Sequence, residues 1–150
     1  MTSRTGPPAE PAPSDNTAAR TSRGSGHVHM ALTVVIVDDH AGFRSLARAC
    51  LEADGFTVLG EAEDGASAVD VCQRLDPDVV LLDVVLPDVD GFEVCAHLTS
   101  GQPMRPAVVL TSSRPAASYT TQLHASTARG FVAKEDITGA ALRALVKVDK

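Results

Sequence analysis

In the stretch VVLLDVVLPDVDG, residues 79–91, one carboxylate, Asp83, stands between two apolar blocks. Residues 79–82 show no alternation of apolar and polar side chains, which is typical of a strand buried on both faces of a parallel sheet. Asp83 stands where that strand ends. Because an unpaired buried carboxylate costs several kcal/mol, we expect Asp83 to emerge into a crevice beside a positive group.

Length and composition set the class of protein. The chain has 150 residues, 44% of them hydrophobic, and a formal net charge of -6, which suits one domain with a real core. No apolar run approaches the roughly 20 residues that span a bilayer, and no signal peptide is visible, so we expect a soluble cytoplasmic protein without membrane contacts. The acidic balance, with no cluster of Lys and Arg, argues against direct binding of nucleic acid.

The three cysteines, Cys50, Cys72 and Cys95, each lie in an apolar helical pattern. Their odd number and wide spacing favour reduced core residues over disulfides or metal ligands.

Residues 1–30 differ in composition from the rest of the chain. They are rich in Pro, Ser, Thr, Gly and Ala, so they cannot bury enough apolar surface to offset the entropy of ordering. We predict a disordered N-terminal tail over 1–30 and one domain over 31–150. His27 and His29 are interpreted as solvated tail residues, and Met30 is an alternative start of the protein.

From Leu32 onward, apolar runs alternate with segments of helical spacing. Five strands are predicted: VVIVD (34–38), FTVLGEA (56–62), DVVLLD (78–83), AVVLTS (107–112) and GFVAK (130–134). Apolar residues at helical spacing follow each of them, most weakly over 115–125. Strict alternation of strand and helix predicts an α/β fold, a doubly wound parallel sheet with helices on both faces.

Polar residues end several of these strands. They are Asp38 and Asp39 on the first, Asp83 on the third, Thr111 on the fourth and Lys134 on the fifth. Because ligands of such sheets bind at the carboxyl ends of the strands, these groups should converge. Carboxylate oxygens suit Mg²⁺, and an aspartate placed there can act as a nucleophile toward phosphorus while the metal and ammonium neutralise charge. Taken singly, Asp39 or Thr111 would be ordinary helix caps, so the prediction rests on all of them together.

The motifs resemble the receiver domain of bacterial response regulators over residues 32 to about 147. The matching motifs are VVIVDDH, VVLLDVVLPDVDG, AVVLTS and GFVAK. The resemblance implies a flavodoxin-like three-layer sandwich with five strands in the order 2-1-3-4-5. It also implies phosphotransfer to Asp83 from a histidine kinase or phosphotransfer protein. Mg²⁺ would be held by Asp38, Asp39, Asp83 and the backbone carbonyl of Val85, and Lys134 would assist.

In the same family a hydroxyl at Thr111 and an aromatic at Phe131 act as the switch that reads out phosphorylation. The implied output is a changed affinity for a downstream protein or a second copy. The expected docking face combines the fourth helix, the fifth strand and the fifth helix. Glu135 after the lysine departs from many receivers and resembles those joined to helix-turn-helix domains, yet the chain ends at Lys150. We therefore expect a stand-alone receiver or a segment of a longer protein.

Two other functions fit parts of the pattern. A Mg²⁺-dependent phosphohydrolase with an aspartyl nucleophile would use the same residue types, but the adjacent Asp38-Asp39 and a nucleophile on the third strand disfavour it. A flavodoxin-like nucleotide binder would need a glycine-rich or hydroxyl-rich loop after the first strand, and the sequence has neither there. We therefore interpret the chain as a signalling switch and not as an enzyme.

Overall fold

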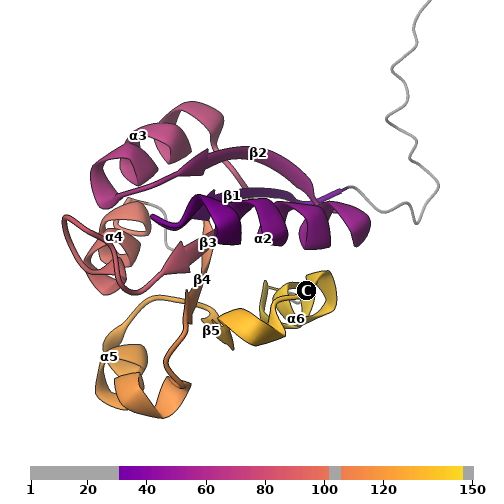
Figure 1. Cartoon of the computed structure of the whole chain (residues 1–150). Helices are drawn as coiled ribbons and strands as arrows, with labels where there is room; N and C mark the ends of the chain where they lie inside the picture. Colours follow the sequence, from indigo (N-terminus) through magenta and orange to yellow (C-terminus); the bar gives the residue numbers. More distant parts are fainter. Residues whose placement is uncertain (1–30, 102–105, 147–150) are drawn as a thin grey trace, which may run out of the picture. The chain divides into compact units, whose positions relative to one another are not determined.

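The computed structural model describes residues 31–101 and 106–146. Five strands form one parallel sheet in the order β2-β1-β3-β4-β5 (Figure 1). This confirms the predicted α/β doubly wound fold and its strand order. The strands are β1 (Thr33–Val37), β2 (Thr57–Ala62), β3 (Val79–Asp83), β4 (Ala107–Ser112) and β5 (Gly130–Ala133).

Helical segments follow each strand and return the chain for the next parallel strand. They are α2 (Ala41–Ala53), α3 (Gly65–Leu75), α4 (Gly91–Leu98), η4 (Ala116–Tyr119), α5 (Thr120–Ala125), η5 (Lys134–Asp136) and α6 (Gly139–Val146), of which η4 and η5 are 3₁₀ turns. None of the helices in the described part of the chain is long and apolar enough to cross a membrane.

Alternate residues of β1 show why the sheet needs helices on both faces. Val34 and Ile36 belong to a buried cluster with residues of α2 and α6, whereas Val35 and Val37 belong to a second cluster with residues of α3 and α4. All four side chains have no solvent exposure. Burial on both faces explains the apolar runs without alternation that identified the strands in the sequence.

The predicted boundaries differ from the observed ones in two informative places. β1 ends at Val37, so Asp38 lies one residue beyond it. The segment predicted as one weak helix over 115–125 is instead the short turn η4 followed by the six-residue α5. Neither receives a hydrogen bond from a capping side chain, and α5 buries no residue, so little favours a longer helix there. The predicted tail, residues 1–30, lies outside the described residues.

Candidate functional site

The carboxyl edge of the sheet presents Asp83 as the last residue of a wholly buried strand. Only 3% of Asp83 is exposed to solvent. Its backbone pairs in register with Thr111 of β4, so the two side chains leave the same face of neighbouring strands. One carboxylate oxygen of Asp83 accepts a hydrogen bond from the backbone N–H of Val85 at 3.1 Å. The other is left for a cationic partner.

Lys134 is that partner. Its Nζ lies 3.2 Å from Oδ2 of Asp83 and 2.6 Å from Oδ2 of Asp38, so one ammonium bridges the buried carboxylate that ends β3 and the buried carboxylate that follows β1. The ring of Phe43 in α2 lies under the same ammonium, 4.6 Å from Nζ to the ring centroid. A cation over an aromatic face gains electrostatic attraction, which helps to hold Lys134 between the acids.

Burial controls the ionisation of this group. It raises the pKa of Asp83 to about 6, and the nearby charge of Asp38 acts in the same direction, against the N–H of Val85 and the ammonium of Lys134. Burial also opposes the charge of Lys134, but the two carboxylates outweigh it and raise the pKa of Lys134. Asp83 is therefore mostly ionised at neutral pH, yet held in a site that disfavours its charge.

Asp38 and Asp39 lie between β1 and α2. Asp38 is fully buried, whereas Asp39 is exposed. His40 is exposed, and its Nδ1 lies 3.2 Å from Oδ1 of Asp38 and 3.1 Å from Oδ1 of Asp39. One ligand atom from each of the three falls within 4.8 Å of the others, a spacing that could hold a cation.

Two buried side-chain oxygens in the described part of the chain lack a hydrogen bond: Oδ2 of Asp38 and Oγ1 of Thr111. Oδ2 of Asp38 is nonetheless paired in charge with Nζ of Lys134 at 2.6 Å, so of the two only the hydroxyl of Thr111 has neither an ion pair nor a hydrogen bond. A buried polar atom left unpaired costs about 1–3 kcal/mol, and such atoms call for an explanation. A carboxylate oxygen open to a further partner fits a hard divalent cation, and a free hydroxyl fits an anionic oxygen.

An arginine that the sequence reasoning missed supports the acidic pair. Nη1 of Arg44 donates to the backbone carbonyl of Asp38 at 2.6 Å, and its Nε donates to Glu61 of β2 at 2.9 Å. Arg48, one turn later, donates to the same Glu61 at 2.8 Å. Burial raises the pKa of Glu61, but the hydrogen bonds from Arg48 and Arg44 lower it overall. In the sequence, the only indication of this contact is that Arg44 follows His40 by four residues, one helical turn.

Aromatic side chains connect β4 with β5. The ring centroid of Tyr119 lies 5.9 Å from that of Phe92 in α4 and 6.1 Å from that of Phe131 in β5. The Tyr119 hydroxyl shares a 3.0 Å hydrogen bond with the hydroxyl of Ser112, the residue after Thr111. Phe131 itself is half-buried at the sequence position predicted for the switch aromatic. Tyr119 was not predicted as a member of this cluster.

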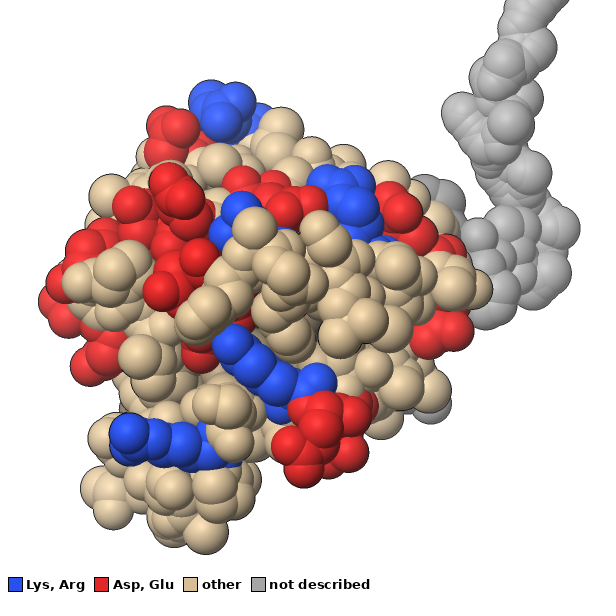
Figure 2. Space-filling model, viewed as in Figure 1, with Lys and Arg blue, Asp and Glu red and all other residues tan. Residues whose placement is uncertain are grey.

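The surface around the edge is acidic. Figure 2 shows Asp and Glu gathered on the side where Figure 1 places the N-terminal ends of α3 and α4, with basic side chains more scattered. The exposed acids in the segments that follow β1, β2 and β3 include Asp39, Glu63, Asp88, Asp90 and Glu93. Such a surface attracts cations.

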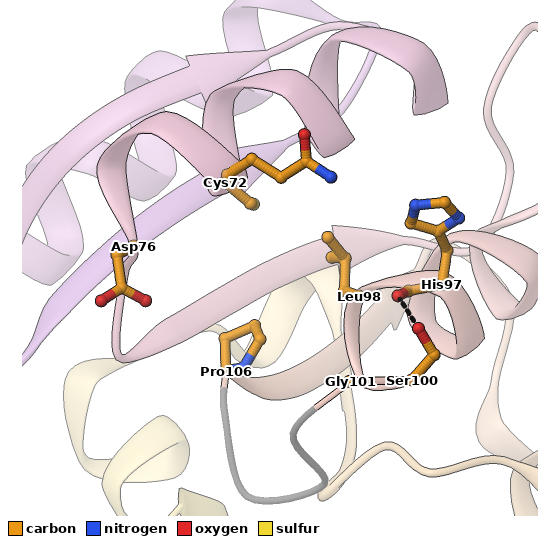
Figure 3. Close-up of a pocket in the computed structure, with 8 residues that line it drawn as sticks. Cys72, Asp76, His97, Leu98, Ser100, Gly101 and Pro106 are labelled. Carbon is orange, nitrogen blue, oxygen red and sulfur yellow. Dashed lines mark hydrogen bonds between the residues drawn. The ribbon is translucent and has the colours of Figure 1, made fainter.

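A pocket of about 350 Å³ lies at the other end of the sheet, between the C-terminal ends of α3 and α4 and the start of β4 (Figure 3). Its wall includes Cys72, whose pKa burial raises to about 12, so the thiol stays protonated. The imidazole of His97 and the carboxylate of Asp76 are labelled there on separate helix ends (Figure 3). Cys72 and Cys95 are buried, Cys50 is half-buried, and all three are free thiols.

The comparisons with known proteins agree with this geometry. A family model described as the response regulator receiver domain matches residues 34–147. A Pseudomonas aeruginosa protein named as a transcriptional regulator is 43% identical over 103 residues, 69% of this chain and 49% of the relative. The Bordetella pertussis virulence regulator BvgA is 36% identical over 104 residues, with the same shares. The solved receiver domain of NarL from Mycobacterium tuberculosis superposes with a TM-score of 0.68 at 32% identity, covering 77% of this chain and 96% of that one. This chain therefore spans about half the length of the curated relatives it matches.

Proposed function

The chain belongs to the response regulator receiver domain family of two-component signalling, and from that premise we propose that it is a phosphorylation switch with Asp83 as the phosphoacceptor. A histidine kinase or phosphotransfer protein would supply the phosphoryl group. The observation that carries the proposal is the pairing of a buried Asp83 with Lys134 beside Thr111, whose hydroxyl has no hydrogen-bond partner among the described residues. Each of these groups has a distinct part in phosphotransfer.

Asp83 supplies the nucleophile. A carboxylate oxygen attacks phosphorus, the new O–P bond forms as the N–P bond of the donor phosphohistidine breaks, and the imidazole leaves with the electron pair of that bond. Lys134 offers positive charge to the phosphoryl oxygens without giving up its proton, because the carboxylates raise its pKa. The buried setting strengthens this attraction, since little water screens it.

Mg²⁺ is the cofactor we propose for this site. Asp38, Asp39, Asp83 and the backbone carbonyl of Val85 would hold it. All four offer oxygen atoms, the ligands that Mg²⁺ prefers. When bound, the cation neutralises charge on the phosphoryl oxygens. Arg44 steadies the acidic pair by donating to the backbone of Asp38.

Thr111 and Phe131 form the proposed readout. A phosphoryl group on Asp83 brings new acceptor oxygens beside Thr111, whose unpaired hydroxyl can donate to one of them. Drawing β4 toward the site moves Ser112 and the Tyr119 bonded to it, and Phe131 packs against Tyr119. The face formed by α5, β5 and α6 then changes, and we propose that a downstream protein or a second copy binds there. Coupling of this kind shifts an existing equilibrium by about 1–3 kcal/mol.

Labelling with a small phosphodonor tests the proposal. Wild-type protein treated with acetyl phosphate and Mg²⁺ should gain one phosphoryl group by intact-mass spectrometry, and chelating the metal should prevent it. Asp83→Asn should stay unlabelled. A matched control is Asp70→Asn, because Asp70 is an exposed acid of α3 that pairs with Arg74. Labelling of Asp83→Asn at the wild-type level would refute Asp83 as the acceptor.

Turnover distinguishes the switch from the phosphohydrolase. The family relatives named as transcriptional regulators favour a signalling domain. We expect no sustained release of phosphate from a generic phosphomonoester by the purified protein. Multiple turnovers that depend on Asp83 would instead support the enzyme.

A further inference from the structure

A carboxylate outside the predicted site fastens the loop that carries Val85. Asp88 lies in the loop 84–90 between β3 and α4, yet it binds the start of α3. Its Oδ1 accepts from the backbone N–H of Gly65 at 2.8 Å, and its Oδ2 accepts from that of Ala66 at 3.0 Å. The N–H of Val89 also donates to Oδ1, at 2.9 Å. The two segments are more than twenty residues apart in sequence, so this contact is a tertiary tether.

Asp88 also supplies hydrogen-bond partners for backbone N–H groups at the start of α3. The first turn of a helix leaves four backbone N–H groups without partners inside the helix. In α3 these groups belong to residues 64–67. Asp88 accepts from Gly65 and Ala66, the carboxylate of Asp64 accepts from Ser67 at 2.8 Å, and the hydroxyl of Ser67 accepts from Asp64 at 3.3 Å. The N–H groups of Gly65 and Ala66 hold the pKa of Asp88 below its usual range, so the contact is charged at neutral pH. A negative charge at this end of a helix is also favoured by the helix dipole.

Two glycines let the loop pack this closely. A Cβ on Gly65 would lie 2.5 Å from a methyl of Val89 and 3.2 Å from Oδ1 of Asp88. A Cβ on Gly91 would lie within 3 Å of the backbone of Val84 and Asp83. The N–H of Gly91 in turn donates to the carbonyl of Val84 at 2.7 Å. Gly91 therefore lets the end of the loop lie against the backbone of its start, and Gly65 leaves room for the side chains of Val89 and Asp88 at the start of α3.

The held loop contains the groups nearest to the phosphoacceptor. The N–H of Val85 donates to Oδ1 of Asp83, and Val85 forms a bridge with Asp90 across the loop. The position of the loop thus fixes one carboxylate oxygen of Asp83. It also fixes the carbonyl of Val85, which the proposed function assigns to Mg²⁺.

From these contacts we propose that Asp88 is a positioning residue for the phosphorylation site, acting by tethering the loop 84–90 to the start of α3. The inference rests on the proposed function for its chemistry. The tether itself acts on the orientation of Asp83 and Val85. Releasing it leaves every residue of the site present but lets the loop that orders them move. Groups that orient metal ligands in this way commonly change metal affinity by about 10–100-fold when removed.

The matched control lies on the same helix. Asp64→Ala removes a cap of α3 from within the helix's own segment, whereas Asp88→Ala removes a cap and the tether together. Both variants should lower the melting temperature by a few degrees, as loss of a cap does. Only Asp88→Ala should weaken Mg²⁺ binding, by about tenfold in calorimetric titration. Only Asp88→Ala should speed amide hydrogen exchange in the loop 84–90 in metal-free protein.

Asp88→Asn provides the rescue. Its side-chain oxygen can still accept from Gly65, so this variant should lie between Asp88→Ala and wild type in both measurements, and it keeps the test open if Asp88→Ala does not fold. Equal Mg²⁺ affinity and equal loop exchange in Asp88→Ala and Asp64→Ala would overturn the inference and leave Asp88 as a cap alone. Failure of wild-type protein to bind Mg²⁺ or to be labelled would instead count against the proposed function, whereas the metal-free exchange of the loop would still test the tether.

Discussion

Two regions meet at the carboxyl edge of the sheet, and they are built differently. The clamped side, residues 64–98, begins its helices with capping carboxylates: Asp64 and Asp88 on α3, and Asp90 on α4, where it accepts from the N–H of Glu93 at 2.9 Å. The switch side, residues 111–133, contains η4 and α5, which have no side-chain cap, and α5 has no buried residue. Carboxylate caps fix the helix starts of the clamped side. The helical segments of the switch side lack such caps, although hydrogen bonds of Ser112 with Tyr119 and of Thr127 with Thr99 still hold this side.

This difference indicates which side suits phosphotransfer and which suits the readout. Phosphotransfer needs groups held in one arrangement, which the clamped side provides. A readout needs a segment whose alternative arrangements differ little in free energy, and such segments come from weakly bonded parts of a fold. The hydrogen bond of Ser112 with Tyr119 links the switch side to the residue beside Thr111.

The pH dependence of stability should be dominated by Asp83 on the clamped side. Its folded-state pKa of about 6 exceeds the ordinary 3.8, so the folded protein holds the proton more tightly than the unfolded chain. The stability from this group is therefore present below about pH 4 and lost as the pH rises to 6, in total about 3 kcal/mol. In metal-free urea titrations Asp83→Asn should exceed wild type in stability at pH 7, and the difference should shrink toward pH 4. A constant difference would contradict the assigned pKa shift.

Gly91→Ala should lower the free energy of unfolding by about 2 kcal/mol. The added Cβ at the start of α4 would lie 2.3 Å from the backbone oxygen of Asp83. Gly42→Ala is the control, since nothing lies within 4 Å of its Cβ position in α2. That change should stabilise the protein by about 0.5–1 kcal/mol. Urea unfolding measures both. Equal effects of the two substitutions would show that close backbone packing at Gly91 is unimportant.

Asp39→Ala should weaken Mg²⁺ binding and suppress labelling by acetyl phosphate, by about tenfold or more, since the proposed site assigns Asp39 to hold the metal and not to react. The control is Glu63→Ala, which removes an exposed acid that follows β2. Calorimetric titration with Mg²⁺ measures the affinity. Unchanged affinity in Asp39→Ala would remove the acidic pair from the site.

The tail should have the smallest effect. Residues 1–29 carry no apolar periodicity, so a chain that begins at Met30 should melt within about one degree of the full-length protein. Differential scanning calorimetry measures this directly. A marked loss of stability would show that the tail docks on the domain.

The sequence predicted the fold well because burial on both faces leaves a plain signal, as in the apolar run before Asp83. It also predicted that Asp38, Asp83 and Lys134 meet, since strand ends of a parallel sheet share an edge. The tether of Asp88 and the bond of Tyr119 with Ser112 were not predictable in this way. Both depend on how a loop and a short turn lie against distant segments, and no periodicity encodes that. The contacts of His40 with Asp38 and Asp39 were not predicted either, because they depend on the side-chain conformation after β1.

The phosphorylation site and the switch side should be coupled. Amide hydrogen exchange with beryllofluoride, a mimic of the phosphoryl group, tests this coupling. In wild-type protein with Mg²⁺, the mimic should change protection across the switch side, around Tyr119 and Phe131, and leave α3 nearly unchanged. Thr111→Ala should still bind the mimic but lose most of that change, because the unpaired hydroxyl that joins the sides is gone. Equal protection changes at Tyr119 and Phe131 in mimic-bound wild type and Thr111→Ala would contradict the account.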